Sequence, residues 1–160
     1  MRSLRLVRAA AVAIGVWLGT CSSTLAGEFT ISLKVQAGGR EQIAGSGQPT
    51  GTRPVFTAKV KEAVLVQWSA INLVSGATLS DVTLHVFMDR GSTRSDPAKP
   101  GPNALYESAV ILDFDPGGKS TGQFRMPMPE SGSYLVRAET IGVSKKLGKE
   151  VVAAMQVSVP

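Results

Sequence analysis

Two alternating segments within residues 64–88 constrain the fold of this chain more than any other feature. Hydrophobic and polar residues alternate in both with a period of two, which is the pattern of a strand with one buried face. The apolar positions are Val64, Val66, Trp68 and Ala70 in the first segment and Val82, Leu84, Val86 and Met88 in the second. A polar connection that contains glycine separates them. The sequence therefore predicts a half-buried antiparallel pair, with Trp68 as the largest filler of a sandwich core.

Similar segments follow one another along the rest of the chain. Half-buried strands are predicted over residues 28–36, 54–60, 105–114, 119–128, 132–141 and 151–159, with a short return strand over 41–44. Turn residues separate the segments, and none has the period of an amphipathic helix. Pro127 and Pro129 indicate that the strand over 119–128 ends at a sheet edge. We therefore expect an all-β, antiparallel, immunoglobulin-like sandwich of about seven or eight strands over residues 27–160.

The first 26 residues have the composition of a secretory signal peptide. Three arginines within residues 1–8 precede an apolar run, residues 9–19, that is too short for a permanent membrane span. Residues 24–26, Thr-Leu-Ala, place small side chains around a cleavage point. We expect cleavage after Ala26 and a mature domain that is periplasmic or secreted.

A second interpretation of the same region is a lipoprotein. Leu18-Gly19-Thr20-Cys21 resembles a bacterial lipobox, although Thr20 stands where Gly, Ala or Ser is expected. Lipidation of Cys21 would anchor the mature chain, and only in that case do we expect contact with a membrane. An uncleaved N-terminal anchor is a third alternative.

The charge balance argues against a nucleic-acid partner. The chain has 17 Lys+Arg and 12 Asp+Glu residues, which gives a formal net charge of +5. Removing the three arginines of the predicted signal peptide leaves 14 basic residues against 12 acidic ones, a net charge of about +2. The densest basic group, Lys145, Lys146 and Lys149, is interpreted as a solvated loop.

The sequence carries a resemblance to a known kind of module. Its motifs are Val64-Leu65-Val66-Gln67-Trp68, then Asn72, Gly76 and Asp81-Val82-Thr83-Leu84, and later Gly132-Ser133-Tyr134-Leu135-Val136-Arg137-Ala138. They resemble bacterial extracellular immunoglobulin-like modules of the CARDB and fibronectin III-like kind, in which a G-x-Y segment opens a late strand. The resemblance covers about residues 54–159. It implies the sandwich architecture and a role in adhesion, scaffolding or protein contact, and it brings no catalytic residues.

The residues themselves do not indicate an enzyme. His85 is the only histidine, and no G-x-S-x-G nucleophile motif is present. Cys21 is the only cysteine, so under either cleavage scheme the mature domain has no free thiol for a disulfide, a thiolate metal site or a nucleophile. His85 shares its parity with Asp81 and Thr83 rather than with the apolar positions. It is therefore predicted to be a surface residue on the more exposed face of its strand.

Two metal sites remain as alternatives. Met126 and Met128, with His85 brought close by folding, would offer soft ligands for copper in a periplasmic copper-handling protein. The preferred interpretation is that these methionines fill gaps in the core. Asp113 and Asp115 could offer oxygens to Ca²⁺, yet the Pro-Gly-Gly that follows explains them as turn residues. No cofactor is expected.

The overall expectation is an exported, non-enzymatic binding or accessory module that contacts another envelope or extracellular protein. Two surfaces are candidates for that contact. One is the irregular stretch over residues 89–103, with three prolines and two glycines, whose composition favours disorder. The other is an exposed sheet edge, since an open edge can accept a further strand.

Overall fold

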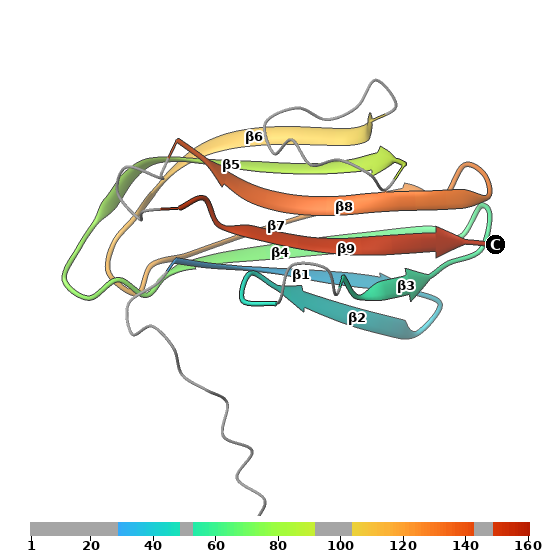
Figure 1. Cartoon of the computed structure of the whole chain (residues 1–160), viewed down its shortest axis with the longest axis horizontal. Helices are drawn as coiled ribbons and strands as arrows, with labels where there is room; N and C mark the ends of the chain where they lie inside the picture. The colour runs from blue at the N-terminus through green and yellow to red at the C-terminus, as the bar shows by residue number, and fades with distance from the viewer. Residues whose placement is uncertain (1–28, 49–52, 92–103, 143–148) are drawn as a thin grey trace, which may run out of the picture.

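The computed structural model describes residues 29–48, 53–91, 104–142 and 149–160. These residues form a two-layer β-sandwich without a helix (Figure 1). The predicted signal peptide, including Cys21, and residues 92–103 of the predicted loop lie outside the described residues. No helix long and apolar enough to cross a membrane occurs in the described part of the chain.

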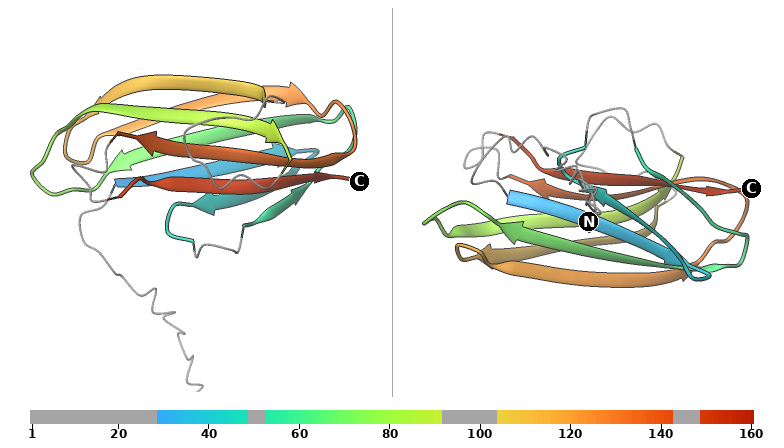
Figure 2. Two further views of the ribbon diagram at one scale, coloured as in Figure 1. Left: turned by 45° about the horizontal axis from the view of Figure 1, so that its top comes forward. Right: turned by 90° about the horizontal axis from the view of Figure 1, so that it is seen from below.

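Nine strands make up the two described sheets. They are β1 (Phe29–Ala37), β2 (Arg40–Gly45), β3 (Val55–Thr57), β4 (Ala63–Asn72), β5 (Leu79–Arg90), β6 (Ala104–Phe114), β7 (Lys119–Pro127), β8 (Gly132–Ile141) and β9 (Val152–Val159). One sheet has the order β2-β1-β4-β7 and the other has the order β3-β9-β8-β5-β6 (Figures 1 and 2). The expectation of an antiparallel sandwich is confirmed, and β7 is an edge strand as predicted.

One pairing departs from the antiparallel pattern. β3 is three residues long, shorter than the predicted strand over 54–60, and it lies parallel to β9 through Val55–Gln156, Phe56–Val157 and Thr57–Ser158. Alternation along a segment cannot show this, because it identifies a strand and its buried face but not the direction of the neighbour.

Side-chain alternation explains how the two sheets enclose one core. Every second residue of β1 is buried and every other one is half-buried, so the strand presents one apolar face throughout. β9 and the first half of β4 show the same period. Fully or nearly fully buried residues from both sheets meet in this layer: Ile31, Leu33, Val66, Leu84, Val86, Tyr134, Val136, Met155 and Val157.

Trp68 is not the largest filler of the core, contrary to the prediction. It is half-buried and packs against the core from β4, with its indole over Gly122, its partner on β7. A Cβ atom added to Gly122 would lie 2.4 Å from Cζ2 of the indole. Because β7 is an edge strand, an indole that lies across it reaches the rim of the sandwich. The largest buried side chains of this core are Tyr134 and Phe114 instead.

Two residues of the resembling motifs hold strand ends by side-chain hydrogen bonds. The buried Asn72 amide donates to the carbonyls of Ala77 and Phe114 at 2.8 and 3.1 Å, and its oxygen accepts the N–H of Val74 at 3.0 Å. It thereby ties the end of β4 to the β4–β5 connection and to the end of β6. The Tyr134 hydroxyl donates to the carbonyl of Glu130 at 2.7 Å, which fixes the start of β8.

Candidate functional site

The outward face of β5 and β8 is buried at its centre, although it is not the face that meets the other sheet. Strand parity places six residues there, all less than one tenth exposed: His85, Phe87 and Asp89 from β5 and Leu135, Arg137 and Glu139 from β8. The outward face of a two-layer sandwich ordinarily carries solvated polar residues. An imidazole, a guanidinium and carboxylates out of contact with water therefore make this face the first candidate for a functional site.

His85 lies between two carboxylates and is only 3% exposed. Its Nε2 atom is 3.0 Å from Oε1 of Glu107 on β6, and its Nδ1 atom is 3.4 Å from Oε1 of Glu139 on β8. The prediction that His85 is a surface residue is therefore wrong. Parity assigned it correctly to the outward face, but parity carries no information on whether that face is covered.

Glu139 is the most deeply placed acid of this group. Its Oε2 atom accepts a hydrogen bond from Nε of Arg137 at 2.5 Å, and its side chain is fully buried. Burial raises the pKa of Glu139 above its ordinary value of 4.5, and the Arg137 charge and hydrogen bond oppose that rise, followed by those of His85. Arg137, Glu139, His85 and Glu107 thus form one chain of polar contacts across three strands. We call these four residues the outer polar cluster.

The outer polar cluster is suited to holding strands together rather than to catalysis by a hydroxyl nucleophile. A histidine that acts as a general base needs one ring nitrogen next to the nucleophile and the other next to an orienting carboxylate. Both ring nitrogens of His85 face carboxylates. Within the described residues, the geometry therefore provides orienters on both sides of the imidazole and no hydroxyl for it to activate.

The residues of the copper alternative do not come together. Met128 is fully buried and Met126 is half-buried against the same core, inside the sandwich. His85 lies on the outward face of β5, so the backbone of the five-stranded sheet separates it from the two sulfur atoms. Among the residues that the structure describes, no group of three or more His, Cys, Asp or Glu side chains could hold a metal ion.

Asp113 and Asp115 have separate partners at the end of β6. Oδ1 of Asp113 accepts the N–H of Asp81 at 2.9 Å, and Oδ1 of Asp115 is 3.3 Å from the hydroxyl of Thr78. The N–H of Gly118 donates to the carbonyl of Asp115 at 2.7 Å and closes the β6–β7 turn. These contacts agree with the turn interpretation of the two acids.

A second candidate surface is the open edge of β6. Residues that bond to one neighbouring strand alternate along an antiparallel strand with residues that bond to the other. The N–H of Gly91 donates to the carbonyl of Ser133, so the odd-numbered residues of β5 bond to β8 and the even-numbered ones bond to β6. The even-numbered residues of β6 form the hydrogen bonds to β5, as in the Val86–Ser108 pair. The others direct their N–H and C=O groups away from β5: Glu107, Ala109, Ile111 and Asp113.

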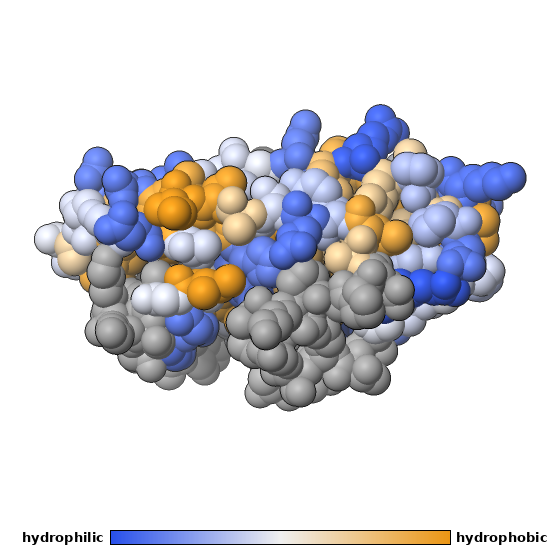
Figure 3. All heavy atoms as spheres, turned by 90° about the horizontal axis from the view of Figure 1, so that it is seen from above, coloured by the Kyte–Doolittle hydropathy of each residue, from blue (hydrophilic) through white to orange (hydrophobic). Residues whose placement is uncertain are grey.

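This edge has only some of the features that usually prevent strands from adding to one another, namely the acids Glu107 and Asp113 and an irregular pairing with β5 at Met88 and Asp89. Natural edge strands are commonly short or carry Lys or Pro, whereas β6 spans 11 residues and contains neither. Ile111 is 71% exposed, and the side chains on either side of it are only partly buried. Figure 3 shows the molecule from the β6 side, where apolar patches lie between hydrophilic residues.

β7 forms the corresponding open edge of the four-stranded sheet. The N–H of Asn72 donates to the carbonyl of Gly118, so the even-numbered residues of β7 bond to β4. The odd-numbered ones point outward: Lys119, Thr121, Gln123 and Arg125. Figure 2 shows β6 and β7 on the same side of the sandwich, one in each sheet. We call these four residues together with Glu107, Ala109, Ile111 and Asp113 the β6/β7 edge.

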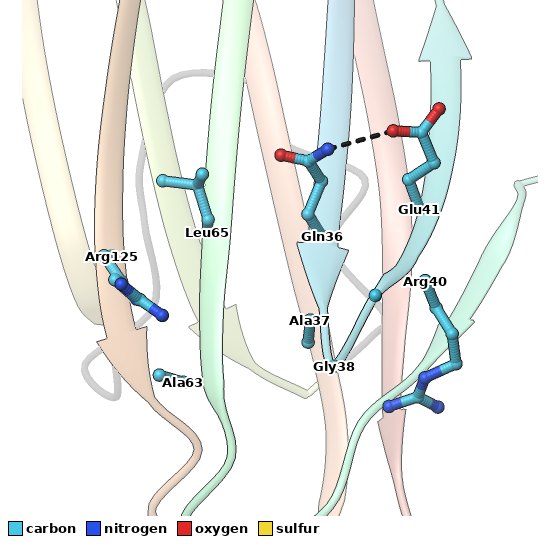
Figure 4. A pocket seen from close by; sticks show the side chains of 9 residues that line it. Gln36, Ala37, Gly38, Arg40, Glu41, Ala63, Leu65 and Arg125 are labelled. Atoms are coloured by element: carbon cyan, nitrogen blue, oxygen red, sulfur yellow. Dashed lines mark hydrogen bonds between the residues drawn. The ribbon is translucent and has the colours of Figure 1, made fainter.

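A shallow hollow of about 370 Å³ lies on the four-stranded sheet beside this edge (Figure 4). Gln36 on β1 donates to Glu41 on β2 at 2.9 Å at its far side, and Arg125 lies on β7, with β4 between it and Gln36. Glu41 is also paired with Lys34 at 2.7 Å. The polar groups at the far side therefore satisfy one another, while Arg125 remains available at the edge.

Sequence reasoning identified an exposed edge as a candidate but did not identify which one. Both proposed surfaces depend on strand order, which places Glu107 and Glu139 on either side of His85 and leaves β6 and β7 without outer neighbours among the described strands. The one available signal was the absence of Lys and Pro between Ala104 and Phe114, because edge strands elsewhere are protected by these residues.

Comparison with known proteins does not assign the chain to a family. No protein-family model matches it, and no curated protein does. The C-terminal domain of wzt is similar in structure with a TM-score of 0.42 and 10% identity, over 80% of this chain and 70% of that one. A β-glucosidase from Listeria innocua, solved with glucose, gives a TM-score of 0.38 and 12% identity over 82% of this chain and 16% of that one. Likenesses this weak support no functional argument.

Proposed function

We propose that this chain is an exported, non-enzymatic binding or accessory module of the cell envelope or its surroundings, and that it contacts a partner protein by strand addition along β6. The observation that carries the proposal is the open 11-residue edge with outward N–H and C=O groups on Glu107, Ala109 and Ile111. An added strand would satisfy these backbone groups and would cover the exposed Ile111 side chain.

Export is the part of the proposal that rests on the sequence alone. Residues 1–26 have the arginine-rich start, the apolar run and the small residues of a cleaved signal peptide. Lipidation at Cys21 is the alternative that would add a membrane anchor.

An immunoglobulin-like assignment is the finer form of the fold and belongs to the same proposal. Strands β1-β4-β7 face strands β9-β8-β5-β6, an arrangement consistent with immunoglobulin-like sandwiches. The bond from the Tyr134 hydroxyl to the carbonyl of Glu130 supports it further, because a tyrosine that bonds back to upstream backbone is typical of a late strand in these domains.

Photo-crosslinking tests the proposal directly. A photoreactive amino acid replaces Ile111 in cells that export the chain, and we expect irradiation to give a covalent adduct with a protein that mass spectrometry identifies. Adding Ala109→Pro should abolish the adduct. The N–H of Ala109 points to the open edge, so proline removes a donor for an incoming strand and leaves the bonds between β5 and β6 in place.

The matched control places the photoreactive amino acid at Ile43, a 54% exposed apolar residue on β2, at the far edge of the four-stranded sheet. Strand addition at β6 predicts an adduct from position 111 that position 43 does not give. No adduct at position 111, or an adduct that persists with Ala109→Pro, would overturn the proposal.

A further inference from the structure

We infer that the strand that adds to β6 is β7 of a second copy of this chain, so that two molecules join their sheets edge to edge. The inference rests on the proposed function, because it names the partner for the open edge. It is carried by charge, by spacing and by the relative position of β6 and β7.

The outward residues of the two strands are complementary when the strands are antiparallel. On β6 the sequence of outward residues is Glu107, Ala109, Ile111, Asp113, and on β7 it is Lys119, Thr121, Gln123, Arg125. The two acids are six residues apart (113 minus 107), and so are the two bases (125 minus 119). One register therefore places Glu107 opposite Arg125 and Asp113 opposite Lys119. It also places uncharged residues opposite each other between them.

The charges on this edge are only partly paired among the described residues. In the part of the chain that the structure describes, Lys119 and Arg125 form neither an ion pair nor a side-chain hydrogen bond. Glu107 is paired with His85 at 3.0 Å, and Asp113 accepts a hydrogen bond from a backbone N–H. Both bases thus lack an acid, and neither acid has a lysine or arginine. A second copy supplies the missing partner to all four.

The relative position of β6 and β7 lies within two residues of this register. Within one molecule the rings of Tyr106 and Phe124 are stacked with centroids 3.7 Å apart, so residues of β6 and β7 whose numbers add to about 230 lie at the same height. A two-fold axis parallel to the strands keeps every residue at its height and exchanges the two layers. It therefore places β6 beside the partner's β7, antiparallel, and places β7 beside the partner's β6 in the same way.

The complementary register lies two residues from that height, which is about 7 Å along one strand. Glu107 and Arg125 add to 232, as do Asp113 and Lys119. The sum is even, as required for two odd-numbered residues that both direct their backbone groups outward. The contact closes on itself because each copy uses both strands, so the inferred assembly is a dimer of two continuous sheets rather than a fibre.

Paired charge reversals test the inference on the purified exported chain by sedimentation velocity. The first variant carries Lys119→Glu with Arg125→Glu, which makes both strands of the edge acidic. The second carries Glu107→Lys with Asp113→Lys, which makes both basic. We expect the wild type to be a dimer and each variant alone to be a monomer, with a dissociation constant raised at least about tenfold by like charges in register.

An equimolar mixture of the two variants restores opposite charges at every position, so we expect it to form a heterodimer. Its formation also shows that both variants are folded. A wild type that stays monomeric up to about 100 μM, a concentration that suits a weak specific contact, would overturn the inference, as would a variant that dimerises like the wild type. The wild type could instead be monomeric and give a crosslink from position 111 to a different protein. That result would show that the partner is not a second copy, and it would leave the proposed function in place.

Discussion

The rings of Tyr106 on β6 and Phe124 on β7 are stacked, with their centroids 3.7 Å apart and their planes 10° apart. This contact joins the open edge of one sheet to the open edge of the other. It packs at the rim of the core, where Tyr106 is only half-buried. The two edges therefore keep a defined height relative to each other.

Replacing Tyr106 with alanine should lower the free energy of unfolding by about 1–3 kcal/mol, because it removes both buried ring area and the stacking contact. It should also weaken the inferred dimer. Tyr106→Phe retains the ring and serves as the control, with a loss well below that of the alanine variant. Urea denaturation measures the first effect and sedimentation velocity the second. Equal losses for Ala and Phe would show that the stack contributes nothing.

Asn72→Asp should destabilise the protein by at least about 1–3 kcal/mol at neutral pH. The replacement is nearly the same size, but it presents a carboxylate to the carbonyls of Ala77 and Phe114, which now accept hydrogen bonds from the amide. Gln67→Glu makes the same chemical change at a half-exposed position on β4 and should have little effect. A similar loss of stability for the two variants in urea denaturation would contradict the role given to Asn72.

Gly122→Ala should cost about 1–3 kcal/mol, since the added methyl group would lie 2.4 Å from the Trp68 indole on the neighbouring strand. Gly45→Ala on β2 is the control, because nothing lies within 4 Å of a Cβ atom there. Trp68 is the only tryptophan after residue 26, so its fluorescence reports the displacement. An emission spectrum unchanged by Gly122→Ala would mean that the indole does not lie over this glycine.

The buried Glu139 gives a pH dependence whose sign follows from its raised pKa. Between the ordinary value of 4.5 and the folded pKa, the folded protein binds the Glu139 proton and the unfolded protein does not. The stability contributed by Glu139 therefore increases as the pH falls through the folded pKa, and its ionised form is penalised at higher pH. His85, Arg137 and Glu107 are the other charged or titratable groups of the cluster.

Glu139→Gln removes this titration, so the difference between the wild type and the variant isolates its effect on stability. The wild type should gain stability relative to the variant as the pH is lowered from neutral towards the ordinary value of 4.5, because the raised pKa lets the folded protein bind this proton before the unfolded protein does. Urea denaturation at several pH values measures the difference. Glu107→Gln alters the exposed end of the cluster and should retain the dependence. A difference between wild type and Glu139→Gln that is constant over this range would rule out a raised pKa.

Alternation alone predicted most strands and their inward faces. Residues 132–141 coincide with β8, and residues 105–114 with all but the first residue of β6. Burial on the outward side was not predictable in this way. Leu135, Arg137 and Glu139 share the parity opposite to Tyr134 and Val136, yet all five are buried. Parity separates two faces of a strand, whereas coverage depends on what lies above each face.

Trp68 shows that parity also fails for a residue predicted to be central in the core. It has the parity of the buried Val66 and Ala70, but its partner across the ladder is Gly122 on an edge strand, so the indole spreads to the rim. Size and parity favoured a central position, and only the order of strands places it near an edge. The β6/β7 edge was undetectable for the same reason, since complementary charges on two segments mean little until the segments are known to be neighbours.

β9 lies between β8 and β3 in the interior of its sheet, with bonded neighbours on both sides. The five-stranded sheet consequently cannot be completed until residue 159 has left the ribosome. Chains that cross a membrane through a narrow channel must remain unfolded during passage. Topology therefore delays closure of this sandwich until its last strand is available, and for the exported chain that we propose this delay would keep the polypeptide unfolded for such passage.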